Sequence, residues 1–339
     1  MRPAASAGVW QPAGMRSRLP LLAIAAVLLA TVGATLLGSW TTEPAAPTPE
    51  APALRVAAAP DAESTLLAHI LVALLAAREV TGEVVVFGDA RDTRQALERG
   101  DVDLHPAYTG EAWLEVLGRA DPPGDPRTSY EEVRAHDADL GLVWFRPSFG
   151  DGITAPPANA TFAFVVPGPP SVDADLVTMS QLASRLSAQP EATLCVDPEF
   201  ASRPDGLSAV LAAYSVRSDQ PVLVTDPEDA VAGVLAGECI AGLTTATDGR
   251  AWAAGLRPLV DDLEVFPAFL PLPQARRDAL LLHPEASAAV RPMAAQLTTQ
   301  LLGRWNAEVH RGRAVEEVAQ EAALELRRRA GLVLSPPPA

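Results

Sequence analysis

Hydrophobic and polar positions from residue 54 onward follow the pattern of short strands alternating with amphipathic helices. Short apolar runs are typical of buried strands, and apolar residues spaced i, i+3, i+4 are typical of helices. Strand, helix, strand, helix and strand are predicted in turn at 54–59, 62–80, 82–88, 92–100 and 101–108. Such a βαβαβ unit favours a parallel sheet covered by helices.

A second series of the same kind follows. Strand, helix, strand, helix and strand are predicted at 191–197, 205–216, 221–226, 227–238 and 239–245. Extended segments at 140–149, 160–166 and 259–271 are positioned to cross between the two units, and the chain then reads as helical to its end. The pattern therefore predicts an α/β protein of two lobes, with lobe 1 at 54–158, lobe 2 at 159–264 and a return to lobe 1 at 265–333.

The N-terminus has the pattern of a targeting segment. Arg16 and Arg18 precede an uncharged stretch at 19–40, which matches the ~20 residues that span a bilayer as a helix. Positive charge before the stretch places the remainder of the chain outside the cytoplasm. We expect residues 1–40 to be an uncleaved membrane anchor, followed by a proline-rich linker at 41–53; the alternative is a signal peptide cleaved after Ala34.

Charge and cysteine content exclude some partners. The formal net charge is -16 and every basic residue apart from histidine is arginine, without a basic stripe, so nucleic acid is not expected as a partner. The five histidines lack metal-ligand spacing, and neither a metal site nor a cofactor is predicted. Outside the cytoplasm the two cysteines, Cys195 and Cys239, favour a disulfide; two separate buried thiols are the alternative.

Aromatic residues are scarce in this chain, yet several fall at predicted connections near the carboxyl ends of strands or on the crossovers. These positions are Tyr108, Phe162, Tyr214, Phe266 and Phe269. Ligands of open α/β sheets bind at that edge, and grouped aromatic faces attract a quaternary ammonium through cation–π interaction. Ordinary core packing is the alternative for each of them.

Four ordered segments carry a resemblance to a known family. They are "RQALERGDVDLHPAYTGE", "DPEFASRPDGLSAVLAAY", "TTATDGR" and "LVDDLEVFPAFLPLP". From about residue 54 to residue 332 the chain resembles the glycine betaine, carnitine and choline substrate-binding proteins of osmoprotectant ABC transporters. The resemblance implies a type II periplasmic-binding-protein fold, with the C-terminal helices on the first lobe. It also implies that the lobes close on a compatible solute and deliver it to a membrane permease.

The resemblance also implies ligand contacts, together with departures from the family pattern. Ser64 replaces a glutamine, Arg91 lies where a small polar residue is usual, Phe162 and Thr245 replace tyrosines, Ala107 replaces a glutamate and Glu111 a threonine. Arg91 could pair with the carboxylate of a solute, or it could simply be solvated at the start of a helix. The expected substrate-binding set is Tyr108, Thr109, Phe162, Tyr214, Phe269, Arg91 and Ser64.

Catalysis is not expected. The sequence has no G-x-S-x-G motif, and Asp261 and Asp262 are adjacent, so on an extended segment they point to opposite faces and make a poor acid–base pair. The expected function is the extracytoplasmic solute-binding component of an ABC importer for glycine betaine, carnitine or choline. The alternative is a membrane-anchored sensory or partner-binding protein with the same lobes and a degenerate solute site.

Overall fold

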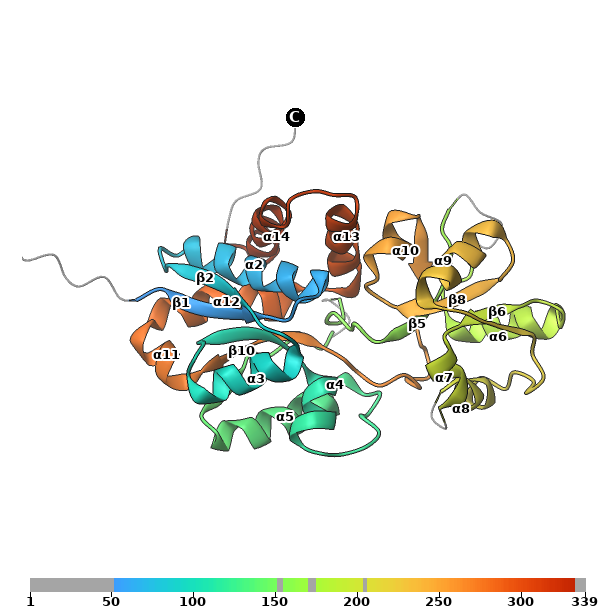
Figure 1. Ribbon diagram of the computed structural model, residues 1–339, viewed down its shortest axis with the longest axis horizontal. Helices are drawn as coiled ribbons and strands as arrows, with labels where there is room; N and C mark the ends of the chain where they lie inside the picture. The colour runs from blue at the N-terminus through green and yellow to red at the C-terminus, as the bar shows by residue number, and fades with distance from the viewer. Residues whose placement is uncertain (1–51, 151–154, 170–174, 204–205, 333–339) are drawn as a thin grey trace, which may run out of the picture. The chain divides into compact units, whose positions relative to one another are not determined.

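The computed structural model describes residues 52–150, 155–169, 175–203 and 206–332 (Figure 1). The predicted anchor at 1–40 and the linker up to residue 51 lie outside these ranges. Within them, no helix is both long enough and apolar enough to cross a membrane.

The first sheet has the strand order β2-β1-β3-β10-β4. Its strands are β1 (Leu54–Ala58), β2 (Gly82–Val86), β3 (Leu104–Tyr108), β4 (Leu142–Trp144) and β10 (Pro271–Arg276). β1 is parallel to β2 and β3, as the βαβαβ pattern predicts, whereas β10 runs antiparallel between β3 and β4. The helical segments between β1 and β4 are α2 (Ala62–Ala76), α3 (Ala90–Arg99), α4 (Thr109–Glu111), η1 (Ala112–Val116) and α5 (Pro126–Asp139).

The second sheet repeats this plan in the order β7-β6-β8-β5-β9. Its strands are β5 (Phe162–Pro167), β6 (Leu194–Val196), β7 (Val222–Val224), β8 (Ala241–Thr245) and β9 (Leu256–Pro258). Its helices are α6 (Met179–Ala188), α7 (Pro198–Ser202), α8 (Leu207–Ala213), α9 (Pro227–Ala236) and α10 (Gly249–Ala253). β6 is parallel to β7 and β8, and β5 enters antiparallel beside β8. Two stretches of chain connect the sheets, and their described parts are 145–150 with 155–161, and 259–270.

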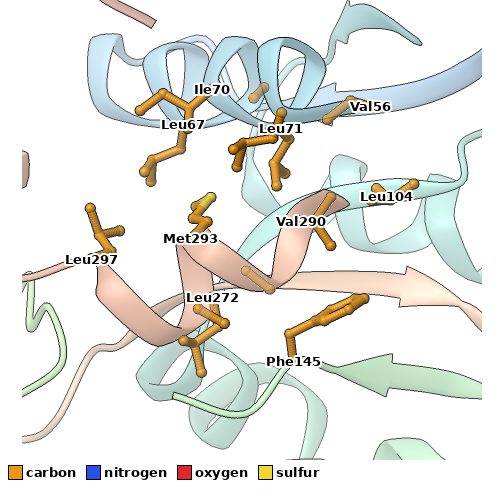
Figure 2. Packing of buried hydrophobic residues seen from close by; sticks show 14 of the residues in the cluster. Val56, Leu67, Ile70, Leu71, Leu104, Phe145, Leu272, Val290, Met293 and Leu297 are labelled. Carbon is orange, nitrogen blue, oxygen red and sulfur yellow. The ribbon is translucent and has the colours of Figure 1, made fainter. Parts of the chain in front are cut away.

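Helix α2 lies at the centre of the first lobe, which is the first sheet with the helices packed on it. The C-terminal helices are α11 (Arg277–Leu282), α12 (Pro284–Gln296), α13 (Thr299–His310) and α14 (Val315–Arg329). Figure 2 shows Leu67, Ile70 and Leu71 of α2 facing Val290 and Met293 of α12. α12 and α14 both pack on α2, so the C-terminal helices cover the first lobe as expected. Burial of each such leucine or isoleucine side chain contributes about 1.5–3 kcal/mol to the free energy of folding.

Helix α13 also contacts the second lobe, which the sequence analysis did not anticipate. It packs against α10, and a Cβ at Gly303 would lie 2.2 Å from the indole Nε1 of Trp252. The indole nitrogen is held in place because it donates to the carbonyl of Ala246 at 2.9 Å. Only glycine at position 303 therefore permits this close approach.

The second lobe contains the cysteine pair. Cys195 in β6 and Cys239, just before β8, are joined by a disulfide with a Cα–Cα distance of 5.7 Å. β6 and β8 are neighbouring strands, so the bond closes a βαβαβ segment whose ends already pair in the sheet.

Candidate functional site

A cavity of about 870 Å³ lies where the connections of the two sheets meet. Three aromatic side chains line it: Tyr108, Phe162 and Phe269. Tyr108 is the last residue of β3, Phe162 is the first residue of β5, and Phe269 belongs to the crossover at 259–270. Both lobes and a connection between them therefore supply aromatic surface to one space.

Tyr108 is fixed at both its backbone and its hydroxyl. Its backbone pairs with Pro271 of β10, and its hydroxyl donates to Oε1 of Glu63 at 2.7 Å. Burial, together with the Glu63 carboxylate, raises the pKa of Tyr108 well above its usual value. The phenol therefore stays neutral and its ring keeps one orientation toward the cavity.

Phe269 is seated by the residues that follow Tyr108. A Cβ at Gly110 would lie 2.5 Å from the ring of Phe269, so the glycine allows the ring to lie on the turn after β3. The Thr109 hydroxyl accepts from the amide of Leu270 at 3.1 Å and donates to the carbonyl of Ala268 at 3.2 Å. Asn159 accepts from the amide of Phe269 at 2.8 Å. Thr109, expected as a ligand contact, is fully buried and positions Phe269 instead.

Glu63 joins three parts of the chain at the edge of the cavity. Its Oε2 accepts from Nδ2 of Asn306 at 2.6 Å, and the same nitrogen donates to the carbonyl of Thr247 at 2.8 Å. Burial raises the pKa of Glu63, although hydrogen bonds from Thr247, Tyr108 and Asn306 oppose that shift. The network links the first lobe, α13 and the turn before α10.

Neither Glu63 nor Asn306 was singled out from the sequence. An acidic residue in the first turn of a helix is explained by the helix dipole alone. Asn306 is separated from Glu63 by 243 residues, and nothing local indicates that the two meet.

The second lobe contributes Phe162 and a charged turn. The ring of Phe162 lies 5.3 Å from that of Phe200, between centroids, and Phe162 pairs with Thr245 in the sheet. The carboxylate of Asp248 accepts from the hydroxyl of Thr244 and from the backbone and guanidinium of Arg250. Burial acts to raise the pKa of Asp248, but the hydrogen bonds from Arg250 and Thr244 hold it below its usual value.

Three further residues of the expected binding set lie away from the cavity lining. Ser64 is buried, and its hydroxyl accepts from the amide of Ala59 at 2.9 Å, which makes it part of the turn before α2. The Arg91 side chain is 68% exposed and pairs with Glu115 at 3.4 Å. Tyr214 lies in the core of the second lobe, where its hydroxyl donates to Asp261 and accepts from the amide of Leu263. The structure thus brings together Tyr108, Phe162 and Phe269.

The two adjacent aspartates have separate structural contacts. Asp261 accepts from Tyr214 and from the amide of Phe266 at 2.6 Å, and Asp262 accepts from the amide of Ser180 at 3.1 Å. Across the described residues, no group of three or more histidine, cysteine, aspartate and glutamate side chains is arranged to hold a metal ion.

Comparison with known proteins finds a matching family model and relatives of similar sequence. The family model described as the substrate binding domain of ABC-type glycine betaine transport systems matches residues 52–323. A glycine-betaine-binding protein of Pseudomonas aeruginosa is 29% identical over 267 residues, covering 77% of this chain and 83% of that protein. Glycine betaine-binding protein YehZ of Escherichia coli is 28% identical over 258 residues, covering 74% of this chain and 82% of YehZ.

Solved structures of similar proteins have the same two-lobed fold. Apo YehZ superposes with a TM-score of 0.72 at 25% identity, covering 83% of this chain and 99% of that structure. A glycine betaine/carnitine/choline ABC transporter structure has the same fold, with a TM-score of 0.70 at 22% identity, over 81% of this chain and 98% of that one.

Proposed function

This chain belongs to the family of substrate-binding domains of ABC-type glycine betaine transport systems, and from that membership we propose that it binds a quaternary-ammonium solute such as glycine betaine, carnitine or choline. The family is a solute-binding rather than a catalytic class, and its members work outside the cytoplasm with a membrane permease. A permease for the same solute is the proposed partner of this chain.

The observation that carries the proposal is the set of three aromatic side chains on one cavity. A quaternary ammonium cannot donate a hydrogen bond, so it is held by aromatic faces, each contributing roughly 0.5–2 kcal/mol depending on desolvation. Tyr108, Phe162 and Phe269 come from separate segments and meet only through the tertiary fold. The hydrogen bond that Tyr108 donates to Glu63, and the one that the amide of Phe269 donates to Asn159, hold two of the rings in place.

The apolar segment at 19–40 supports a further proposal, that the chain remains anchored to the membrane with its lobes outside. The mature N-terminus distinguishes the two alternatives: an intact segment in the membrane fraction supports the anchor. A start near Thr35 with protein released to the medium would identify a cleaved signal peptide.

Calorimetric titration tests the function directly. The full chain, purified in detergent, is titrated with glycine betaine, choline and carnitine, with proline as a solute that lacks the trimethylammonium group. Saturable binding of at least one quaternary ammonium, and not of proline, is the expected result. Absence of binding by all three would refute the proposal and favour a sensory or partner-binding protein built on the same lobes.

A further inference from the structure

Helix α13 follows the first-lobe helix α12 in the chain but packs chiefly on the second lobe. Its contact with α10 is more extensive than its contacts with α2 and α14. The two helices approach closely at two points: Gly303 lies against the indole of Trp252, and a Cβ at Gly249 would lie 2.6 Å from the carbonyl oxygen of Asn306. The second lobe therefore fixes the position of α13.

The side chain of Asn306 bridges the two lobes through a single amide nitrogen. One hydrogen of Nδ2 is donated to the carbonyl of Thr247 in the second lobe, at 2.8 Å, and the other to Oε2 of Glu63 in α2, at 2.6 Å. Oε1 of Glu63 in turn accepts from the hydroxyl of Tyr108 at 2.7 Å. A continuous chain of hydrogen bonds thus runs from the backbone of the second lobe to a ring that lines the cavity.

The orientation of the Tyr108 ring depends on this chain of hydrogen bonds. Pairing with Pro271 fixes the backbone of Tyr108, but the side-chain torsions that direct its ring are set by the hydroxyl and its acceptor. The acceptor, Glu63, has a flexible side chain whose carboxylate keeps one position while both of its oxygens are engaged. A ring that already faces the cavity binds a cation without the entropic cost of being ordered at that moment.

We propose, resting on the function proposed above, that Asn306 is a positioning residue for solute binding, which transmits the docking of α13 on α10 to the ring of Tyr108. The affinity for a quaternary ammonium then depends on a contact between Gly303 and Trp252, neither of which is among the described residues that line the cavity.

Two substitutions interrupt the chain of hydrogen bonds at different points. Asn306→Ala removes the amide itself, whereas Gly303→Ala places a methyl group 2.2 Å from Nε1 of Trp252 and so displaces α13 from α10. Gly233→Ala is the matched control, because its methyl group would lie 2.8 Å from Sγ of Cys195 within the second lobe. Gly233 does not belong to the described lining of the cavity, so this control should lower stability and leave the affinity unchanged.

Calorimetry on the full chain in detergent uses choline or glycine betaine, whichever the unsubstituted chain binds more tightly. Asn306→Ala should weaken binding by about fivefold, and Gly303→Ala by a similar factor, since both release the hydrogen bond to Glu63. The double variant should stay near fivefold, whereas independent effects would multiply to about 25-fold.

Fluorine NMR of the chain labelled with 3-fluorotyrosine observes the ring directly, because the sequence contains only three tyrosines. Replacing each tyrosine in turn by phenylalanine assigns the three signals. In the solute-free protein, Asn306→Ala and Gly303→Ala should both shift the signal of Tyr108 and leave that of Tyr130 in place. Gly233→Ala should leave the Tyr108 signal unchanged.

The outcomes separate the inference from the proposed function. A Tyr108 signal that neither variant moves, an unchanged affinity, or effects that multiply in the double variant would overturn the inference and leave the function in place. Asn306→Leu, which keeps most of the side-chain volume, replaces Asn306→Ala if that variant folds poorly. Failure of every quaternary ammonium to bind would refute the proposed function, and the fluorine signals would still show whether Asn306 positions the ring.

Discussion

Two tyrosines show how the two lobes use the same side chain differently. Tyr108 in the first lobe and Tyr214 in the second each end a secondary-structure element, and each donates its hydroxyl to a carboxylate, Glu63 or Asp261. Tyr108 lines the cavity, whereas Tyr214 is buried in the hydrophobic core of the second lobe. A tyrosine–carboxylate hydrogen bond orients a ring on the cavity lining in the first lobe, and in the second lobe it holds the crossover at 259–270.

Chain direction explains the difference. Tyr108 ends a strand, and the carboxyl ends of parallel strands meet at the edge where ligands bind. Tyr214 follows α8, and α7 and α8 connect the parallel strands β6 and β7, so the end of α8 leads to the opposite edge, where β7 begins. A residue at the end of a strand and a residue at the end of a helix are therefore not equivalent candidates for a site.

The largest effect on the free energy of unfolding is expected from removing the disulfide of the second lobe, which should leave the cavity intact. Replacing both Cys195 and Cys239 by serine opens a loop with a sequence separation of 44, for which the chain-entropy model gives a loss of about 4 kcal/mol in the free energy of unfolding. Denaturant unfolding with and without reductant measures the loss. The solute affinity of the folded variant should stay within about twofold, because neither cysteine lines the cavity. Two free thiols in the non-reduced protein by mass spectrometry would contradict the assignment.

Tyr214→Ala comes next. It removes a buried ring and leaves Asp261 without its hydroxyl donor, so we expect a loss of roughly 3 kcal/mol in the free energy of unfolding. Tyr214→Phe keeps the ring and should lose about 1 kcal/mol. Affinity for the solute, measured on the folded fraction, should change little in either variant. A large drop in affinity without a drop in stability would place Tyr214 in the site after all.

Tyr108→Ala should do the reverse of Tyr214→Ala and change the solute affinity more than the stability. Loss of the aromatic face is expected to weaken solute binding by about tenfold or more, whereas Tyr108→Phe should weaken it much less because the ring remains. Tyr130→Ala serves as the control, since Tyr130 packs edge-on against Phe149 away from the cavity and should alter stability but not affinity. Unchanged affinity in Tyr108→Ala, in a chain that does bind the solute, would remove the aromatic site.

The smallest effect is a pH dependence confined to the first-lobe side of the cavity. The pKa of Glu111 is raised to about 7, with Glu115, Asp61 and Glu63 as its charged neighbours, so the carboxyl is protonated below that pH. Choline affinity should therefore rise, by up to about tenfold, as the pH increases from about 5.5 to 8.5. In the solute-free protein the same raised pKa means that Glu111 lowers the free energy of unfolding progressively as the pH rises from about 4.5 to about 7, and adds no further loss above that pH. Calorimetry at several pH values should show a nearly flat profile for Glu111→Gln, and an equally steep profile in that variant would assign the dependence to another group.

The sequence by itself determined the features that depend on local pattern. The strand and helix periodicity placed β1, β2, β3, β6, β7 and β8 and the helices between them, and the ordered segments identified the family that the comparisons confirm. Tyr108, Phe162 and Phe269 could be selected because each stands at a strand end or on a crossover, positions that chain order alone reveals. The antiparallel placement of β5 and β10 could not be selected in this way, since an extended segment does not specify which strands it joins.

Only the tertiary structure decided which side chains meet. The Glu63–Asn306 hydrogen bond joins residues far apart in the chain, and Gly303 accommodates Trp252 of the other lobe. Arg250 finds Glu228 on a different helix, and among the described residues Glu111 lies near three other carboxylates, those of Glu115, Asp61 and Glu63. Periodicity records which face of an element is buried, but charge compensation and ring contacts depend on distances between elements. Those distances, and with them the lining of the cavity, arise only when the two sheets and α13 come together.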